Sequence, residues 1–139
     1  MKNDFTLDST YSELIMDLIK NPVNKGNLVD ANVKVKAGNP YCGDEITIFI
    51  KLKSGRISEM KYESKGCAIS NASASLLSEK IKGMKIEEVL KLSQEDMFDL
   101  FQARILSRIK CVTLSLKAVQ RGLKRFSENG KKIDEEITV

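Results

Sequence analysis

Residues 33–65 alternate between hydrophobic and other side chains with a period of two, which is typical of β-strands. The pattern predicts three strands, at residues 33–35, 45–52 and 57–63. Ser54-Gly55 separates the last two as a tight turn, so we expect these strands to pair as an antiparallel hairpin. One face of the sheet should be covered and the other partly exposed, because charged residues follow the second face.

Helical spacing replaces this pattern on both sides of the strands. A capping box at Thr10–Glu13, followed by hydrophobic residues at helical spacing, predicts a first helix that ends at Asn21-Pro22. Residues 68–82 predict a second helix that is crowded with alanine and serine, and Gly83 is placed to close it.

The C-terminal half predicts three more helical segments. A short one covers residues 86–92, and a capping signature at Ser93–Asp96 introduces another that contains Met97 and two phenylalanines. The last helix runs from about residue 109 to 126. Its hydrophobic residues recur at steps of three and four and form one stripe that should pack on the sheet: Ile109, Val112, Leu116, Val119, Leu123 and Phe126.

These elements predict an α+β fold in which a three-stranded antiparallel sheet is packed with helices. Residues 1–126 should form a single domain, because about 140 residues is a common size for one hydrophobic core. Residues 127–139 are polar, and we expect them to be a flexible tail.

Composition narrows the possible functions. Hydrophobic residues make up 42% of the chain and charged residues 30%, which is ordinary for a globular protein. No apolar run is long enough to span a membrane and the N-terminus does not resemble a targeting leader, so we expect a cytoplasmic protein without membrane contact. Histidine is absent, which counts against a cysteine hydrolase, because no imidazole is available to activate a thiol.

The net charge of +4 is mild, and its basic residues concentrate on the last predicted helix. Lys110, Lys117, Arg121 and Lys124 fall outside the hydrophobic stripe of that helix and should face solvent. No aromatic residue interleaves with them, so surfaces on which bases could stack are lacking. We therefore expect no nucleic-acid binding.

Three cysteines, Cys42, Cys67 and Cys111, lie at the ends of predicted elements. Their odd number and wide spacing match no small disulfide framework, which indicates reduced thiols. Cys67 and Cys111 are predicted at helix starts, where the helix dipole should lower the pKa of each thiol below the free value of about 8.5. Each cysteine taken alone could also be present only for packing.

Asp44 lies two residues after Cys42, and in an extended segment such residues point the same way. Gly43 between them permits backbone angles that other residues avoid. Three thiolates and one carboxylate form a ligand set suited to zinc or to iron. The spacing alone is a weak signal, because no pair of these cysteines is close in sequence.

Four segments in order resemble the IscU/SufU/NifU N-terminal family of iron–sulfur cluster assembly proteins. These are NPVNKG at residues 21–26, NPYCGD at 39–44, GCAIS with ASAS at 66–75, and RIKC at 108–111. The resemblance covers roughly residues 9–126. It implies a two-layer α/β sandwich of the SufE/NifU type, with a three-stranded antiparallel sheet and the cysteines gathered at one end.

The resemblance also implies a function and its residues. Family members receive sulfur from a cysteine desulfurase, assemble an iron–sulfur cluster and pass it to apo-proteins. Cys42, Asp44, Cys67 and Cys111 would be the ligands of a transient iron–sulfur cluster, of iron or of zinc. The carboxylate would keep the cluster labile, and Cys42 is our choice for a thiol that accepts persulfide sulfur.

Two branches of the family differ around the third cysteine. The IscU branch has a histidine before this cysteine and an LPPVK segment that docks a chaperone, whereas residues 106–110 here read LSRIK, which gives chaperone dependence no support. RIKC resembles the SufU branch, whose members bind zinc and act as sulfurtransferases. The insertion usual in that branch between the second and third cysteines is missing, so scaffold and zinc-dependent sulfurtransferase both stay open.

Overall fold

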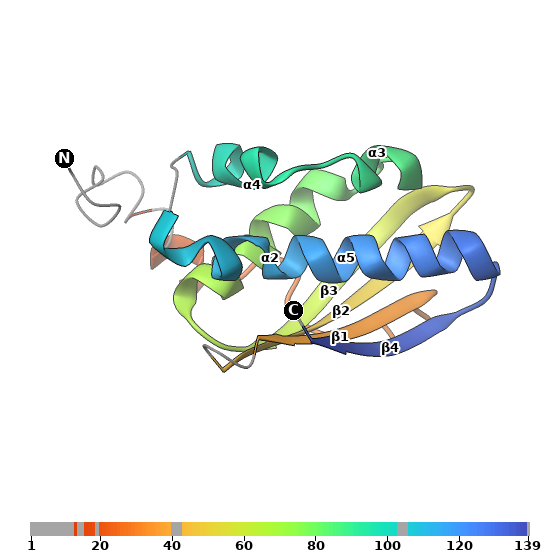
Figure 1. Ribbon diagram of the computed structural model, residues 1–139, viewed down its shortest axis with the longest axis horizontal. Helices are drawn as coiled ribbons and strands as arrows, with labels where there is room; N and C mark the ends of the chain where they lie inside the picture. Colours follow the sequence, from red (N-terminus) through yellow and green to blue (C-terminus); the bar gives the residue numbers. More distant parts are fainter. Residues whose placement is uncertain (1–12, 14–15, 19, 40–42, 103–105, 139) are drawn as a thin grey trace.

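The structure is a computed structural model that describes residues 13, 16–18, 20–39, 43–102 and 106–138. Its strands are β1 (Val33–Asn39), β2 (Asp44–Lys53), β3 (Arg56–Lys65) and β4 (Ile133–Thr138). Its helices are α2 (Ala68–Ile81), α3 (Ile86–Leu90), α4 (Gln94–Phe101) and α5 (Ile109–Asn129), with a 3-10 turn at Leu106–Arg108 before α5. Figure 1 shows α2 and α5 lying over one face of the sheet, with α3 and α4 beyond them.

The predicted meander is confirmed as the antiparallel strands β1, β2 and β3. Ile46, Ile48 and Ile50 of β2 face the helices and are at most 1% exposed, as their alternation predicted. The pairing of β2 with β3 shifts register between Lys51 and Leu52, close to the Ser54-Gly55 turn. The hairpin therefore places Glu45 opposite Lys65, and so brings the start of β2 beside the end of β3.

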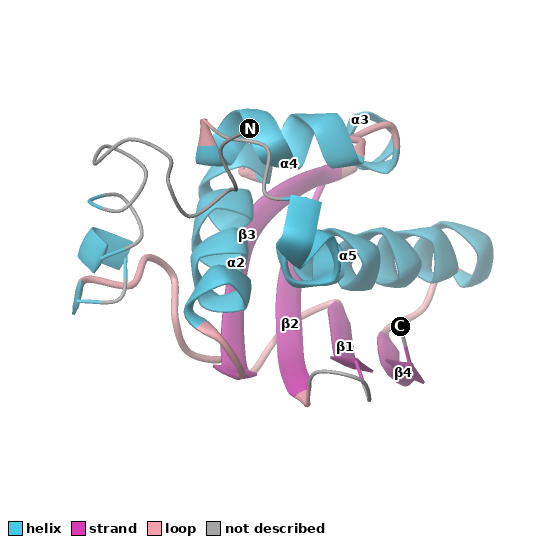
Figure 2. Cartoon of the chain, turned by 60° about the vertical axis from the view of Figure 1, so that its left-hand side comes forward, coloured by secondary structure: helices cyan, strands magenta, loops and turns pink. Residues whose placement is uncertain are grey.

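The sheet has a fourth strand, so the prediction of three strands was wrong in number. The strand order is β3-β2-β1-β4, and β4 runs parallel to β1 at the edge, as Figure 2 shows. The residues expected to form a flexible tail instead extend α5 to Asn129 and supply β4. Ile133 of this strand is 7% exposed, and its burial next to β1 explains why a mostly polar segment joins the sheet.

Helix α5 confirms the predicted stripe. Val112, Val119 and Leu123 are fully buried, whereas the basic residues of the helix are exposed. The start of α4 is also as predicted: the Asp96 backbone N–H donates a hydrogen bond to Ser93 Oγ at 3.3 Å, and the Ser93 backbone N–H donates one to Asp96 Oδ2 at 2.7 Å. The first predicted helix lies largely outside the described residues, of which Glu13, Met16–Leu18 and Lys20 are helical.

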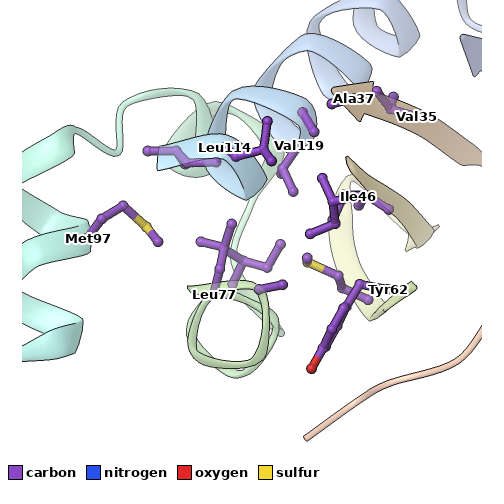
Figure 3. Close-up of a cluster of buried hydrophobic side chains, with 14 of the residues drawn as sticks. Val35, Ala37, Ile46, Tyr62, Leu77, Met97, Leu114 and Val119 are labelled. Atoms are coloured by element: carbon purple, nitrogen blue, oxygen red, sulfur yellow. The ribbon is translucent and has the colours of Figure 1, made fainter. Parts of the chain in front are cut away.

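The core lies between the sheet and the helices, and Figure 3 shows side chains from β1, β2, β3, α2, α4 and α5 meeting there. The serines of α2 take part, because Ser75 shares a 2.6 Å hydrogen bond with the buried hydroxyl of Tyr62. Ser73 bonds the Val112 carbonyl oxygen at 2.5 Å, which ties α2 to α5. Among the described residues, no helix has the length and apolar content needed to cross a membrane.

Candidate metal centre

Asp44, Cys67 and Cys111 converge at one end of the molecule. Asp44 begins β2, Cys67 immediately precedes α2, and Cys111 lies in the first turn of α5. Figure 1 shows α2 and α5 beginning toward the left of the view. One ligand atom from each residue lies within 4.8 Å of the others. The fold thus brings together three of the four predicted ligands from positions far apart in sequence. Cys42, the fourth, lies outside the described residues.

The hairpin and the start of α2 position the first two groups. Gly43 has a φ of +71°, the left-handed conformation that favours glycine, as expected for the bend before Asp44. Asp44 is 4% exposed, and its Oδ1 accepts a 3.0 Å hydrogen bond from the Cys67 backbone N–H. A Cβ added at Gly66 would lie 2.7 Å from Asp44 Oδ1, so only glycine leaves the carboxylate its place.

Ser70 contacts both groups from the first turn of α2. Its hydroxyl donates a 2.6 Å hydrogen bond to Asp44 Oδ2, and its backbone N–H donates to Cys67 Sγ at 3.4 Å. Cys67 Sγ lies 3.6 Å from Asp44 Oδ2, where its thiol donates as well. Cys67 therefore caps α2, and its place directly before the helix agrees with the predicted helix start.

The surroundings of the Cys111 thiol favour its protonated form. Its burial, together with hydrogen bonds to Asp44 and Cys67, raises its pKa to about 12. The prediction that the start of α5 would lower this pKa was wrong, because the loss of hydration and the neighbouring acidic groups outweigh the helix dipole. A metal ion that binds here must displace this proton.

Arg108 brings a positive charge to the same place. A hydrogen bond with Cys111, and then the charge of Cys67, raise the pKa of the Arg108 guanidinium. The same guanidinium also reaches Cys67.

The donor set fits a metal ion. In a tetrahedral site with Zn–S bonds of about 2.3 Å, ligand atoms are separated by roughly 3.5–4 Å. The three ligand atoms lie within 4.8 Å of one another, so small side-chain movements would satisfy that geometry. Two thiols and one carboxylate suit zinc or iron better than magnesium or calcium, which prefer oxygen ligands.

Sequence reasoning missed the role of Ser70 at this site. It noted the serine only as one of several small residues in the predicted helix. A usable signal was present, because Ser70 follows the capping residue Cys67 by three positions and so lies in the same first turn.

Comparison with known proteins defines the class. The NifU-like N terminal domain family matches residues 10–133, and the chain belongs to this family. The zinc-dependent sulfurtransferase SufU of Bacillus subtilis (strain 168) is 40% identical over 141 residues, which covers 88% of this chain and 95% of that protein. The iron-sulfur cluster assembly scaffold protein IscU 1 of Archaeoglobus fulgidus is 35% identical over 124 residues, covering 89% of this chain and 81% of that protein.

Solved structures agree with this assignment. A crystal structure of a putative iron-sulfur cluster assembly scaffold protein for the SUF system from Fervidobacterium islandicum AW-1 matches with a TM-score of 0.71 and 28% identity, covering 83% of this chain and 97% of that one. A NifU-like protein from Brucella abortus matches with a TM-score of 0.72 at 19% identity, which supports the fold alone.

The alignments of this chain with the two relatives differ in the gaps that they need. The match to the Archaeoglobus scaffold is 124 positions long and covers 89% of the 139 residues, also about 124, so it needs essentially no gap in this chain. The match to the Bacillus sulfurtransferase is 141 positions long but covers 88%, about 122 residues, which leaves about 19 positions of that protein unmatched. This difference agrees with the missing insertion that the sequence indicated.

Proposed function

We propose that this protein is a scaffold on which iron–sulfur clusters are assembled and from which they are passed to apo-proteins. The observation that carries the proposal is the convergence of Asp44, Cys67 and Cys111 in a member of the NifU-like family. Cys42, Asp44, Cys67 and Cys111 would hold the cluster, which is cargo rather than a permanent cofactor. A cysteine desulfurase would supply the sulfur.

The chemistry of the ligand set supports a temporary cargo. Thiolates are soft ligands that suit iron–sulfur clusters, whereas a carboxylate is a harder ligand and binds such a cluster less firmly. Replacing one thiolate by Asp44 therefore favours release. The nearly complete burial of Asp44 and Cys111 would meanwhile protect the cluster from water.

Purification without oxygen tests the scaffold. Protein reconstituted with ferrous iron, a cysteine desulfurase, cysteine and a thiol reductant that reduces the persulfide sulfur to sulfide should contain iron and acid-labile sulfide in equal amounts, with a charge-transfer absorption. Asp44→Cys, which supplies a softer thiolate in place of the carboxylate, should retain the cluster longer against a chelator, while Cys67→Ala and Cys111→Ala should not hold it. Protein that gains neither iron nor sulfide, or cysteine variants that gain as much as wild type, would contradict the proposal.

A second function is favoured by a separate observation. The Bacillus relative named as a zinc-dependent sulfurtransferase is 40% identical, and the RIKC segment at residues 108–111 resembles its branch. In this alternative the same residues bind zinc, and Cys42 accepts sulfur. The Cys42 thiolate would attack the terminal sulfur of the desulfurase persulfide, which forms a Cys42 persulfide and returns the desulfurase cysteine as a thiolate.

Mass spectrometry separates the two functions. The zinc-loaded protein is incubated with a desulfurase and cysteine in the absence of iron and then analysed without reduction. A single added sulfur that disappears in Cys42→Ser supports the sulfurtransferase, provided that the zinc-free protein gains less. Equal labelling of the three thiols, or none, counts against it.

A further inference from the structure

Ser70 touches two of the proposed ligands, Asp44 and Cys67, without being one of them. It is 1% exposed, and its hydroxyl donates a 2.6 Å hydrogen bond to Asp44 Oδ2. This length lies in the range of charge-assisted O–H···O⁻ bonds, which are about twice as strong as neutral ones. The carboxylate therefore has a firm, buried partner on the side of α2.

The Asp44 carboxylate has little freedom to rotate, because both of its oxygens accept hydrogen bonds. Oδ1 accepts from the Cys67 backbone N–H at 3.0 Å, and Oδ2 accepts from Ser70. Gly66 closes the remaining side, since a Cβ there would approach Oδ1 to 2.7 Å. Without the Ser70 hydroxyl, Oδ2 would lose its 2.6 Å partner and keep the longer contact from the Cys67 thiol at 3.6 Å, which restrains it less.

Ser70 also acts on the sulfur. Its backbone N–H donates to Cys67 Sγ at 3.4 Å, and its hydroxyl lies 3.6 Å from the same atom. The Cys67 thiol in turn donates to Asp44 Oδ2 at 3.6 Å. A metal ion would displace the Cys67 thiol proton, which lies between Sγ and Asp44 Oδ2. The Ser70 hydroxyl would then still donate its hydrogen bond to Oδ2.

We propose that Ser70 is a positioning residue that fixes the direction in which Asp44 presents its oxygen to the bound metal. This inference rests on the proposed function of the site. Hydrogen-bond partners of metal ligands orient them, and their loss typically weakens metal binding by about 10–100-fold. Ser70 therefore sets how firmly the site holds its metal.

Zinc affinity measured with a chromophoric chelator tests the proposal. Ser70→Ala should weaken zinc binding by about 10–100-fold. Ser73→Ala is the matched control, because Ser73 lies on the same helix, is equally buried and bonds the Val112 carbonyl oxygen rather than a ligand. The control should stay within about threefold of wild type, since it leaves the ligand contacts intact.

A double substitution tests whether Ser70 acts through Asp44. In the Asp44→Ala background, adding Ser70→Ala should change zinc affinity by less than about threefold, because the group to be oriented is gone. Cobalt absorption gives a second readout, since its visible bands report ligand geometry. Ser70→Ala should alter them and Ser73→Ala should not.

If Ser70→Ala does not fold, comparing Ser70→Thr with Ser70→Val measures the effect of the hydroxyl on zinc binding. The two replacements have the same shape, so only the first should retain zinc. Equal affinity for this pair, or a loss in Ser70→Ala that persists undiminished without Asp44, would overturn the role of Ser70. A wild-type protein that binds neither zinc nor cobalt would overturn the metal site itself, and the role of Ser70 with it.

Discussion

At the scale of single residues, the structure separates two cysteines that look alike in the sequence. Both lie at helix starts, and helix starts favour the thiolate. Cys67 is half-exposed, whereas Cys111 is 4% exposed and faces Asp44 and Cys67. Position in a helix was readable from the sequence, but burial and the approach of a carboxylate from another element were not.

In the metal-free protein, the rate of alkylation should differ between Cys67 and Cys111. Burial raises the pKa of Cys111 to about 12, so at pH 8 almost none of it is thiolate, the reactive form. Cys111 should therefore react with iodoacetamide at least about tenfold more slowly than Cys67. The alkylation rate of Cys111 should keep rising with pH up to about 12, because the thiol is fully ionised only above its pKa in the folded protein.

Peptide mass spectrometry of timed samples measures these rates. The same reaction in concentrated urea is the control, because both thiols should then react alike. Equal rates in the folded protein would show that the environment of Cys111 does not suppress its thiolate.

At the scale of elements, the hairpin explains why Asp44 and Cys67 meet. With Glu45 opposite Lys65, Asp44 falls beside the turn that leads into α2. The strands and the Ser54-Gly55 turn were predictable, but the register shift at Lys51 and Leu52 was not. A one-residue change of register would turn Asp44 to the other face of the sheet.

Strand β4 is the element that the sequence reading missed. Its polar composition suggested a tail. However, the more buried positions Ile133, Glu135 and Ile137 alternate with exposed residues, which is the spacing of a strand. Glu135 Oε2 also lies 3.2 Å from Arg125 Nε of α5. The signal was present, but it was too short to distinguish an edge strand from a polar end of the chain.

Replacement of Ile133 tests whether this strand belongs to the folded domain. Because Ile133 is 7% exposed and pairs with Val33, Ile133→Ala should lower the free energy of unfolding by about 2–3 kcal/mol. Glu136→Ala, on the exposed face of the same strand, should change it by less than about 0.5 kcal/mol. Urea denaturation measures both, and equal stabilities would mean that β4 adds nothing to the domain.

At the scale of the whole molecule, the candidate site joins elements from across the fold. Asp44 begins β2, Cys67 caps α2 and Cys111 starts α5, so a bound metal would link the sheet to both helices that cover it. The family resemblance predicted that the cysteines gather at one end. Their distances and hydrogen bonds depend on how α5 packs on the sheet, which no local pattern specifies.

Metal binding should therefore stabilise the entire domain rather than one region. A ligand at 100 times its dissociation constant adds about 2.7 kcal/mol to the free energy of unfolding. For a domain of 139 residues, this corresponds to a rise in Tm of roughly 8–12 °C. Zinc that binds to the thiols of the unfolded chain would reduce this rise in Tm, because the stabilisation depends on how much more tightly zinc binds the folded state than the unfolded state.

Calorimetry with zinc, and again after chelation, measures this shift. Wild-type protein should unfold in one transition that moves upward with zinc, because the ligands lie on elements that share one core. Asp44→Ala should lose most of the shift. Asp30→Ala is the matched control, since it removes an exposed acid that pairs with Lys51 at 2.7 Å, and its Tm should rise with zinc as much as that of wild type. A zinc-induced shift that survives Asp44→Ala, or one confined to a partial transition, would contradict a centre that links the sheet to α2 and α5.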